Sequence, residues 1–274
     1  MTKASILSVQ GKVQGDLELP QVFETPYRPE VIHKVYVNVM SHSYQRQGRY
    51  PAAGEMVSAE SRNTGLGIAR LARARGEGFQ RAGQAASVAG VRHGRVAHPP
   101  ESWKTIYKKI NEKERRLGLS SAIAATSNRE LVAQRGHKVP ENIQLPIVVS
   151  NEIESIRKAK EVQNLLSALG MDADLKRARG SHKVNSGTAR RRGRSARSGL
   201  SALIVVGNES KMTTLSTSIP GIDIKRAEEI SVLDLAPGSR PARLTIYSEN
   251  AVKHFEGLKT RVNNVMEIAT RSSK

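Results

Sequence analysis

Two segments of this 274-residue chain carry most of its positive charge, and the longer one lacks the apolar residues of a protein core. Residues 41–100 hold nine arginines, no lysine and three glutamates, a net charge of +6. Residues 176–199 hold nine basic residues and no acid, a net charge of +9. Because the whole chain carries +19, its remaining residues are close to neutral. The sequence therefore predicts a nearly neutral globular part with two basic segments.

This excess of positive charge restricts the class of partner. Like charges repel one another in a compact monomer, and a polyanion beside them relieves that repulsion. Nucleic acid is the first candidate, and an acidic membrane surface is the second. No apolar run approaches the ~20 residues of a spanning helix, and the first ten residues lack signal-peptide features. The absence of cysteine excludes disulfides and thiolate metal sites, so we expect a cytoplasmic protein without a membrane partner.

The first basic segment is poorly suited to forming a core. Its sixty positions contain only seven Val, Ile or Leu residues but nine glycines, as in residues 65–78, GLGIARLARARGEG. Such a segment cannot bury enough apolar surface to offset the entropy lost on ordering. Loops of this length are uncommon in compact domains and are normally functional. We therefore predict an extended loop over residues 45–100 that orders only when bound.

The choice of basic residue also indicates the partner. Guanidinium groups bind phosphates through two parallel hydrogen bonds and stack on bases, while interleaved glycines let two backbones approach closely. This combination favours a crowded RNA interior. The second segment contains residues 190–197, RRRGRSAR, without an interleaved acid. We interpret it as a phosphate-binding basic loop over 176–199 rather than a solvated loop or a targeting tag.

The rest of the chain alternates in the manner of an α/β protein with a mostly parallel sheet flanked by helices. Apolar runs predict strands at 146–149, 202–206, 221–224 and 243–247, and a hairpin over 6–19 that turns near Gly11. Periodic apolar residues predict helices over 29–45, 102–127, 152–169 and 250–269, with a break near Gly118. We expect one α/β domain over 1–274, interrupted by the 45–100 loop.

Enzyme motifs are weak or missing. Gly65 and Gly67 resemble part of a dinucleotide fingerprint, but no strand precedes them, and no P-loop is present. The seven histidines show no metal-ligand spacing. We therefore predict no catalytic residue, cofactor, metal or small-molecule substrate. The rival interpretations are an RNA-modifying enzyme, such as a methyltransferase, and a general DNA-compacting protein.

Aromatic residues of the first segment are candidates for stacking on unpaired bases. Phe79 is the best candidate, because it lies between Gly78 and Gln80 without an apolar stripe. Trp103 follows the segment, and its position suits either stacking or packing where the loop returns.

Several motifs together resemble one known family. Residues 58–65 (SAESRNTG), 92–100 (RHGRVAHPP), 120–126 (SSAIAAT), 135–138 (RGHK), 145–149 (LPIVV) and 234–238 (DLAPG) resemble ribosomal protein L four, in its archaeal and eukaryotic branch. The matches run in order over nearly the whole chain, and its length resembles the archaeal type.

The resemblance implies a structural protein of the large ribosomal subunit, with large-subunit rRNA and neighbouring ribosomal proteins as partners. It implies a loop that threads into rRNA, with a tip over roughly 66–90 whose residues 75–84 approach the nascent peptide in the exit tunnel. Leu66 and Ile68 depart from the family, since relatives often have Arg or Ala there. The charge pattern and the resemblance together give the predicted rRNA-binding residues: Arg46, Arg49, Arg62, Arg70, Arg73, Arg75, Arg81, Arg92, His93, Arg95, His98, Lys183, Arg190, Arg191, Arg192, Arg194 and Arg197.

Overall fold

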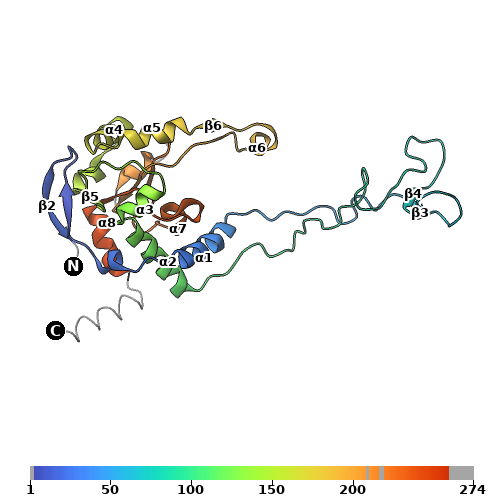
Figure 1. Ribbon diagram of the computed structural model, residues 1–274, viewed down its shortest axis with the longest axis horizontal. Coiled ribbons are helices and arrows are strands. Elements are labelled where there is room, and N and C mark those ends of the chain that lie inside the picture. Colours follow the sequence, from blue (N-terminus) through green and yellow to red (C-terminus); the bar gives the residue numbers. More distant parts are fainter. Residues whose placement is uncertain (1–2, 208–209, 216–218, 259–274) are drawn as a thin grey trace. The chain divides into compact units, whose positions relative to one another are not determined.

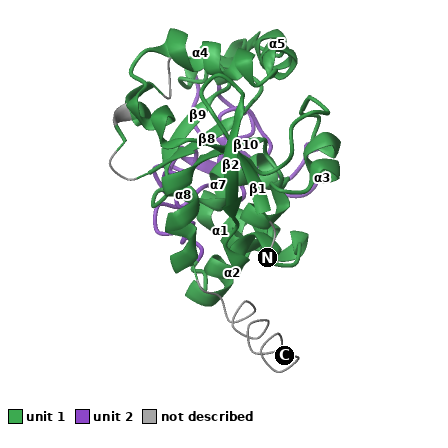
Figure 2. Ribbon diagram, turned by 90° about the vertical axis from the view of Figure 1, so that its left-hand side faces the viewer, with its two compact units in different colours: residues 1–40, 109–274 green, residues 41–108 purple. Residues whose placement is uncertain are grey.

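A computed structural model describes residues 3–207, 210–215 and 219–258. The chain divides into two compact units, one formed by residues 1–40 and 109–274 and the other by residues 41–108 (Figure 2). We call the first the α/β unit and the second the arginine-rich unit. Each is described by itself.

A six-stranded sheet forms the centre of the α/β unit, in the order β2-β1-β5-β10-β8-β9 (Figure 1). Among the described strands of this sheet, β1 (Lys3–Leu7) and β2 (Val13–Glu18) form the one antiparallel pair. The other strands run parallel to β1: β5 (Ile147–Val149), β10 (Thr245–Ser248), β8 (Leu203–Val206) and β9 (Asp223–Arg226). The predicted mostly parallel α/β fold is confirmed.

Helices cover both faces of this sheet. Successive strand residues point to opposite sides, and since these residues are apolar, both faces must be buried. On one face, Ile147, Ile204 and Ile246 join a core with α3 (Arg129–Gln134), α4 (Ala159–Ala168) and α5 (Asp172–Gly180). On the other, Val148 and Val205 join a core with α1 (Pro29–Ser41), α2 (Glu112–Ala125), α7 (Val232–Leu235) and α8 (Glu249–His254). The 3-10 turns Gln21–Glu24 and Phe255–Gly257 complete the second face.

Three predicted helix boundaries need correction. Helix α1 begins at Pro29 as expected but ends at Ser41. The helix predicted over 152–169 is divided into a 3-10 turn, Asn151–Ser155, and α4, because Ile156 and Lys158 adopt extended backbone angles. The helix predicted over 102–127 begins only at Glu112, after an Asn111 cap whose side chain accepts from the Lys113 N–H.

Gly118 does not break α2, contrary to the prediction. A Cβ at this position would lie 2.6 Å from a methyl group of Val35 on α1, so glycine permits the two helices to approach closely. The final predicted helix, 250–269, is described only as α8 and the following 3-10 turn, and its remainder lies outside the described residues. The predicted hairpin near Gly11 is confirmed, with Gly11 at φ +80° in the turn.

Candidate nucleic-acid interface

The arginine-rich unit has a small sheet of its own. Strands β3 (Ala59–Ser61) and β4 (Ala72–Ala74) pair antiparallel, and β4 also exchanges hydrogen bonds with residues 84–86 (Figure 1). Among its described residues, the buried apolar side chains are only Ala74 and Ala86. The backbone ladder, rather than a core, therefore holds this segment together.

The predicted RNA-binding residues of this unit are mostly exposed to solvent. Arg46, Arg62, Arg70, Arg75, Arg92, His93 and His98 are exposed, and Arg49, Arg73, Arg81 and Arg95 are partly buried. Within the described part of the chain, the guanidinium groups of Arg46, Arg62, Arg70 and Arg92 form no ion pair or hydrogen bond. These positive charges are therefore available to an external anion.

Other arginines of the unit are held by its own atoms. Arg73 donates to the carbonyl of Gly83 at 3.0 Å, and Arg81 donates to the carbonyl of Arg92 at 3.3 Å. Arg75 forms an exposed ion pair with Glu60 at 2.6 Å. Since a guanidinium has five N–H donors, each of these groups retains donors for a phosphate. Phe79 is 46% exposed, as base stacking requires.

The second basic segment begins within α5 and continues as a small hairpin rather than as an irregular loop. Strands β6 (Lys183–Val184) and β7 (Ala196–Arg197) pair antiparallel and enclose the short helix α6 (Gly187–Arg191). We call residues 183–197 the basic hairpin. Its predicted site residues are all exposed: Lys183, Arg190, Arg191, Arg192, Arg194 and Arg197.

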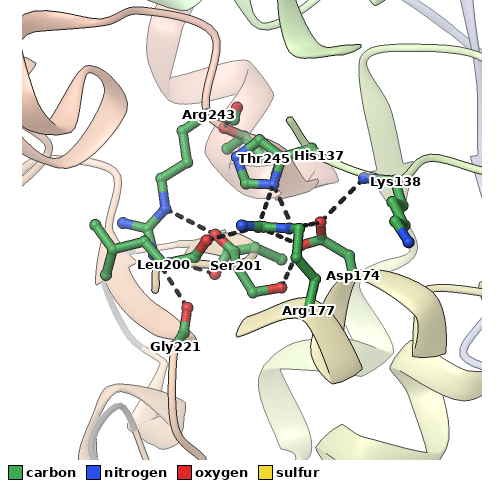
Figure 3. A network of polar contacts seen from close by, with 10 residues as sticks. His137, Lys138, Asp174, Arg177, Leu200, Ser201, Gly221, Arg243 and Thr245 are labelled. Atoms are coloured by element: carbon green, nitrogen blue, oxygen red, sulfur yellow. Dashed lines mark hydrogen bonds and ion pairs between the residues drawn. The ribbon is translucent and has the colours of Figure 1, made fainter. Parts of the chain in front are cut away.

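A buried polar network fixes the base of the basic hairpin (Figure 3). We call His137, Asp174, Arg177 and Ser201 the anchor network. Asp174 is fully buried and accepts from Arg177 Nε at 2.9 Å and from the Ser201 hydroxyl at 2.6 Å. Arg177 also donates to the carbonyl of Leu200 at 2.8 Å. The network thus joins α5, which precedes the hairpin, to the chain that enters β8 after it.

Charge stabilises this network. Burial by itself raises the pKa of Asp174, but hydrogen bonds from His137, Arg177, Ser201 and the Lys138 N–H outweigh it and hold that pKa well below its usual range. Burial lowers the pKa of His137, although Asp174 opposes this effect. A neutral His137 can donate its Nδ1–H to Asp174, whose oxygen lies 3.2 Å away.

The anchor network contains a serine, a histidine and an aspartate, but it lacks the geometry of a catalytic triad. The Ser201 hydroxyl binds the carboxylate rather than the imidazole, and a nucleophile needs an adjacent base. All three side chains are buried. Among the described residues, moreover, no group of three His, Asp or Glu side chains could hold a metal ion. The network is therefore structural.

Sequence reasoning missed two arginines beside this network, the buried Arg243 and the partly buried Arg135. Arg243 is 1% exposed, donates to the Ser201 carbonyl at 2.9 Å and pairs with Asp223 at 2.7 Å. Arg243, which precedes β10, thereby links the segment before β8 to the first residue of β9. Arg135 donates to the carbonyls of Pro237 and Arg240, so the 135–138 and 234–238 motifs meet. Burial, followed by the charges of neighbouring arginines, lowers the pKa of Arg135 to about 10.

The low pKa of His137 predicts a pH-dependent stability. An unfolded histidine has a pKa of about 6.5, so the unfolded chain binds a proton at a pH at which folded His137 does not. We therefore expect the free energy of unfolding to be highest above that pH and to fall as the pH drops below it. Urea titrations at several pH values measure this effect, and His137→Gln should reduce the slope. An unchanged slope in that variant would contradict the prediction.

Comparison with known proteins identifies the family. Residues 17–258 match the Ribosomal protein L4/L1 family. The chain belongs to this family. It is 41% identical over 252 residues to the large ribosomal subunit protein uL4 of Methanococcus vannielii, covering 92% of this chain and 97% of that protein. The uL4 proteins of Methanosphaera stadtmanae and Sulfolobus acidocaldarius are 38% and 37% identical, covering 94% and 93% of this chain and 98% and 96% of those proteins.

Membership of the L4/L1 family confirms the resemblance found from the sequence motifs, and the relatives are archaeal as expected. It also confirms the interpretation as a structural, non-enzymatic protein and gives the RNA-modifying enzyme no support. Within the described part of this L4-family chain, no helix is long and apolar enough to cross a membrane.

Proposed function

We propose that this chain is a structural constituent of the large ribosomal subunit in the cytoplasm, where it binds large-subunit rRNA and neighbouring ribosomal proteins. Its L4/L1 family membership and the names of its uL4 relatives support this role. The observation that carries RNA binding is the set of exposed guanidinium groups, without a partner among the described residues, on a unit with almost no apolar core. Phosphates between RNA helices would neutralise these guanidinium charges, and the arginine-rich segment would become ordered as it binds them.

The two basic segments have different roles in this proposal. The 45–100 segment penetrates rRNA as an extended loop, with Phe79 available to stack on an unpaired base. Its residues 75–84 approach the wall of the exit tunnel and the nascent peptide. The basic hairpin acts instead as a phosphate clamp on the α/β unit, since its arginines project from a base that the anchor network fixes.

Sedimentation tests the proposed function. A tagged copy of the chain, expressed in its own cells, should sediment with large subunits on a sucrose gradient and remain there after a moderate salt wash. A copy found only at the top of the gradient would overturn the proposal. A copy that sediments equally well with bulk DNA and with subunits would favour the DNA-compacting alternative.

Limited proteolysis of the free protein tests whether the loop needs RNA in order to become ordered. We expect rapid cleavage of the free protein between residues 46 and 95, because the segment buries few apolar side chains and local opening costs little there. The α/β unit should survive, since its sheet is buried on both faces. A loop that resists protease as long as the α/β unit does would mean that it folds without RNA.

A further inference from the structure

The arginine-rich unit narrows to a pair of adjacent chain segments, residues 41–48 and 101–108, which we call the neck. A Cβ on Gly48 would lie 2.9 Å from the backbone nitrogen of Ser102, so the two backbones are in contact. The Lys108 N–H donates to the Ser41 hydroxyl at 3.0 Å, and the His42 ring nitrogen Nε2 lies 3.0 Å from the Lys108 carbonyl. The neck is therefore fixed by contacts within the unit itself.

Three aromatic side chains of this neck are exposed, and Trp103 and Tyr107 on its second segment are two of them, with Tyr44 on the first segment as the third. Trp103 is 68% exposed and lies in a turn closed by a hydrogen bond from the Lys104 N–H to the Glu101 carbonyl. Tyr107 is 55% exposed and stacks on His42, with ring centroids 3.9 Å apart and an angle of 7° between the planes. Stacking on His42 covers one face of the tyrosine ring. The Tyr107 ring is thus held by its stack on His42 and the Trp103 backbone by its turn, while large parts of both ring surfaces remain uncovered.

Exposed rings on an ordered, basic segment have the properties of a base-stacking platform. Every nucleobase has a flat apolar face, and aromatic side chains next to cations bind unpaired bases without sequence preference. Arg46, Lys104 and Lys108 supply positive charge along the two neck segments. The four-residue separation of Trp103 and Tyr107 spans at most ~14 Å, a distance that one short single strand can cover.

We propose that the neck binds unpaired RNA bases by stacking on Trp103 and on the His42–Tyr107 pair. This inference rests on the proposed rRNA-binding function but assigns a second stacking site, separate from Phe79 and from the phosphate contacts of the arginines. It requires single-stranded RNA, because the faces of paired bases are covered within a helix. A neighbouring protein that packs on these rings is the competing occupant.

The fluorescence of the full-length chain reports on this site directly, because Trp103 is the only tryptophan. The probes are an oligoadenylate of about twelve nucleotides, within the usual size of single-strand sites, and an RNA duplex of equal length. We expect the oligoadenylate to quench Trp103 emission and to protect it from acrylamide. The duplex should bind through its phosphates and leave the emission unchanged.

Matched variants complete the test. Trp103→Leu and Tyr107→Leu should each weaken oligoadenylate binding by about five- to one-hundred-fold, whereas Trp103→Phe keeps a ring and most of the affinity. Tyr27→Leu, at an exposed aromatic of the α/β unit, is the control and should bind normally. Tight oligoadenylate binding with unchanged Trp103 emission and unaffected leucine variants would overturn the neck site while leaving the proposed rRNA binding intact. If Trp103 emission is protected from acrylamide in assembled subunits but not by RNA alone, the rings pack against a neighbouring protein and the neck site is wrong.

Discussion

Replacement of Asp174 by alanine should lower the free energy of unfolding of the α/β unit by about 3–5 kcal/mol, the usual cost of breaking a buried ion pair. The fully buried carboxylate accepts hydrogen bonds from Arg177, Ser201 and the Lys138 N–H. Its removal leaves the Arg177 guanidinium without its counter-ion. Urea unfolding followed by circular dichroism measures the loss.

The same helix provides a matched control for this prediction. Asp172 lies two residues earlier on α5 and is exposed, and among the described residues its side chain accepts only from the Ser167 hydroxyl, at 2.7 Å. Asp172→Ala should therefore cost no more than about 1 kcal/mol, from the lost hydrogen bond and the helix-end charge. Similar losses for the two variants would show that the anchor network does not stabilise the fold.

Replacement of the five hairpin arginines, Arg190, Arg191, Arg192, Arg194 and Arg197, by glutamine should strongly reduce rRNA affinity. Each neutralised phosphate contributes roughly 0.7 to 0.9 to the steepness of the plot of log affinity against log salt concentration. The variant with all five substitutions should therefore flatten that slope by about 3.5 to 4.5. Binding to a large-subunit rRNA transcript across a salt series gives the slope directly. The thermal stability of the α/β unit should remain unchanged, since all five side chains are exposed.

Lysine at the same five positions separates charge from hydrogen-bond geometry. The lysine variant keeps the charge and should retain the salt-dependence slope. It loses the bidentate hydrogen bonds of guanidinium to phosphate, however, and should bind rRNA more weakly. An unchanged slope in the glutamine variant would mean that the basic hairpin does not contact phosphate. The assignment of the clamp would then be wrong, whatever the arginine-rich unit binds.

Much of the α/β unit could be predicted because its strands are short apolar runs. Residues 202–206, for example, consist of ALIVV, and such a run is stable only when buried on both faces, as in β8. Helix boundaries were less predictable where tertiary contacts outweighed local preference. Glu154 fits the helical pattern of 152–169, yet its carboxylate accepts from the Gly207 N–H at 2.9 Å and from the Ser248 hydroxyl at 2.7 Å, and the helix is interrupted after it.

The candidate interface shows the same division. The two basic segments could be recognised from charge, because a large cationic excess needs an anionic partner wherever it lies in the fold, and the family resemblance added to the choice of individual arginines. The assignment of individual contacts to those arginines remains a prediction. Arg177 belongs to the same basic run, but it serves the anchor network instead, and the sequence contains no sign of this difference.

The fold class, the family and the location of the positive charge could all be inferred from the amino-acid sequence, because they follow from composition and from short motifs. Tertiary contacts, in contrast, set which basic residues are exposed and which are held within the fold. Asp174 is 37 positions from His137 and 27 from Ser201, and Ser102 lies far along the chain from Gly48. Contacts of this kind depend on packing between distant segments, which no local pattern of residues encodes.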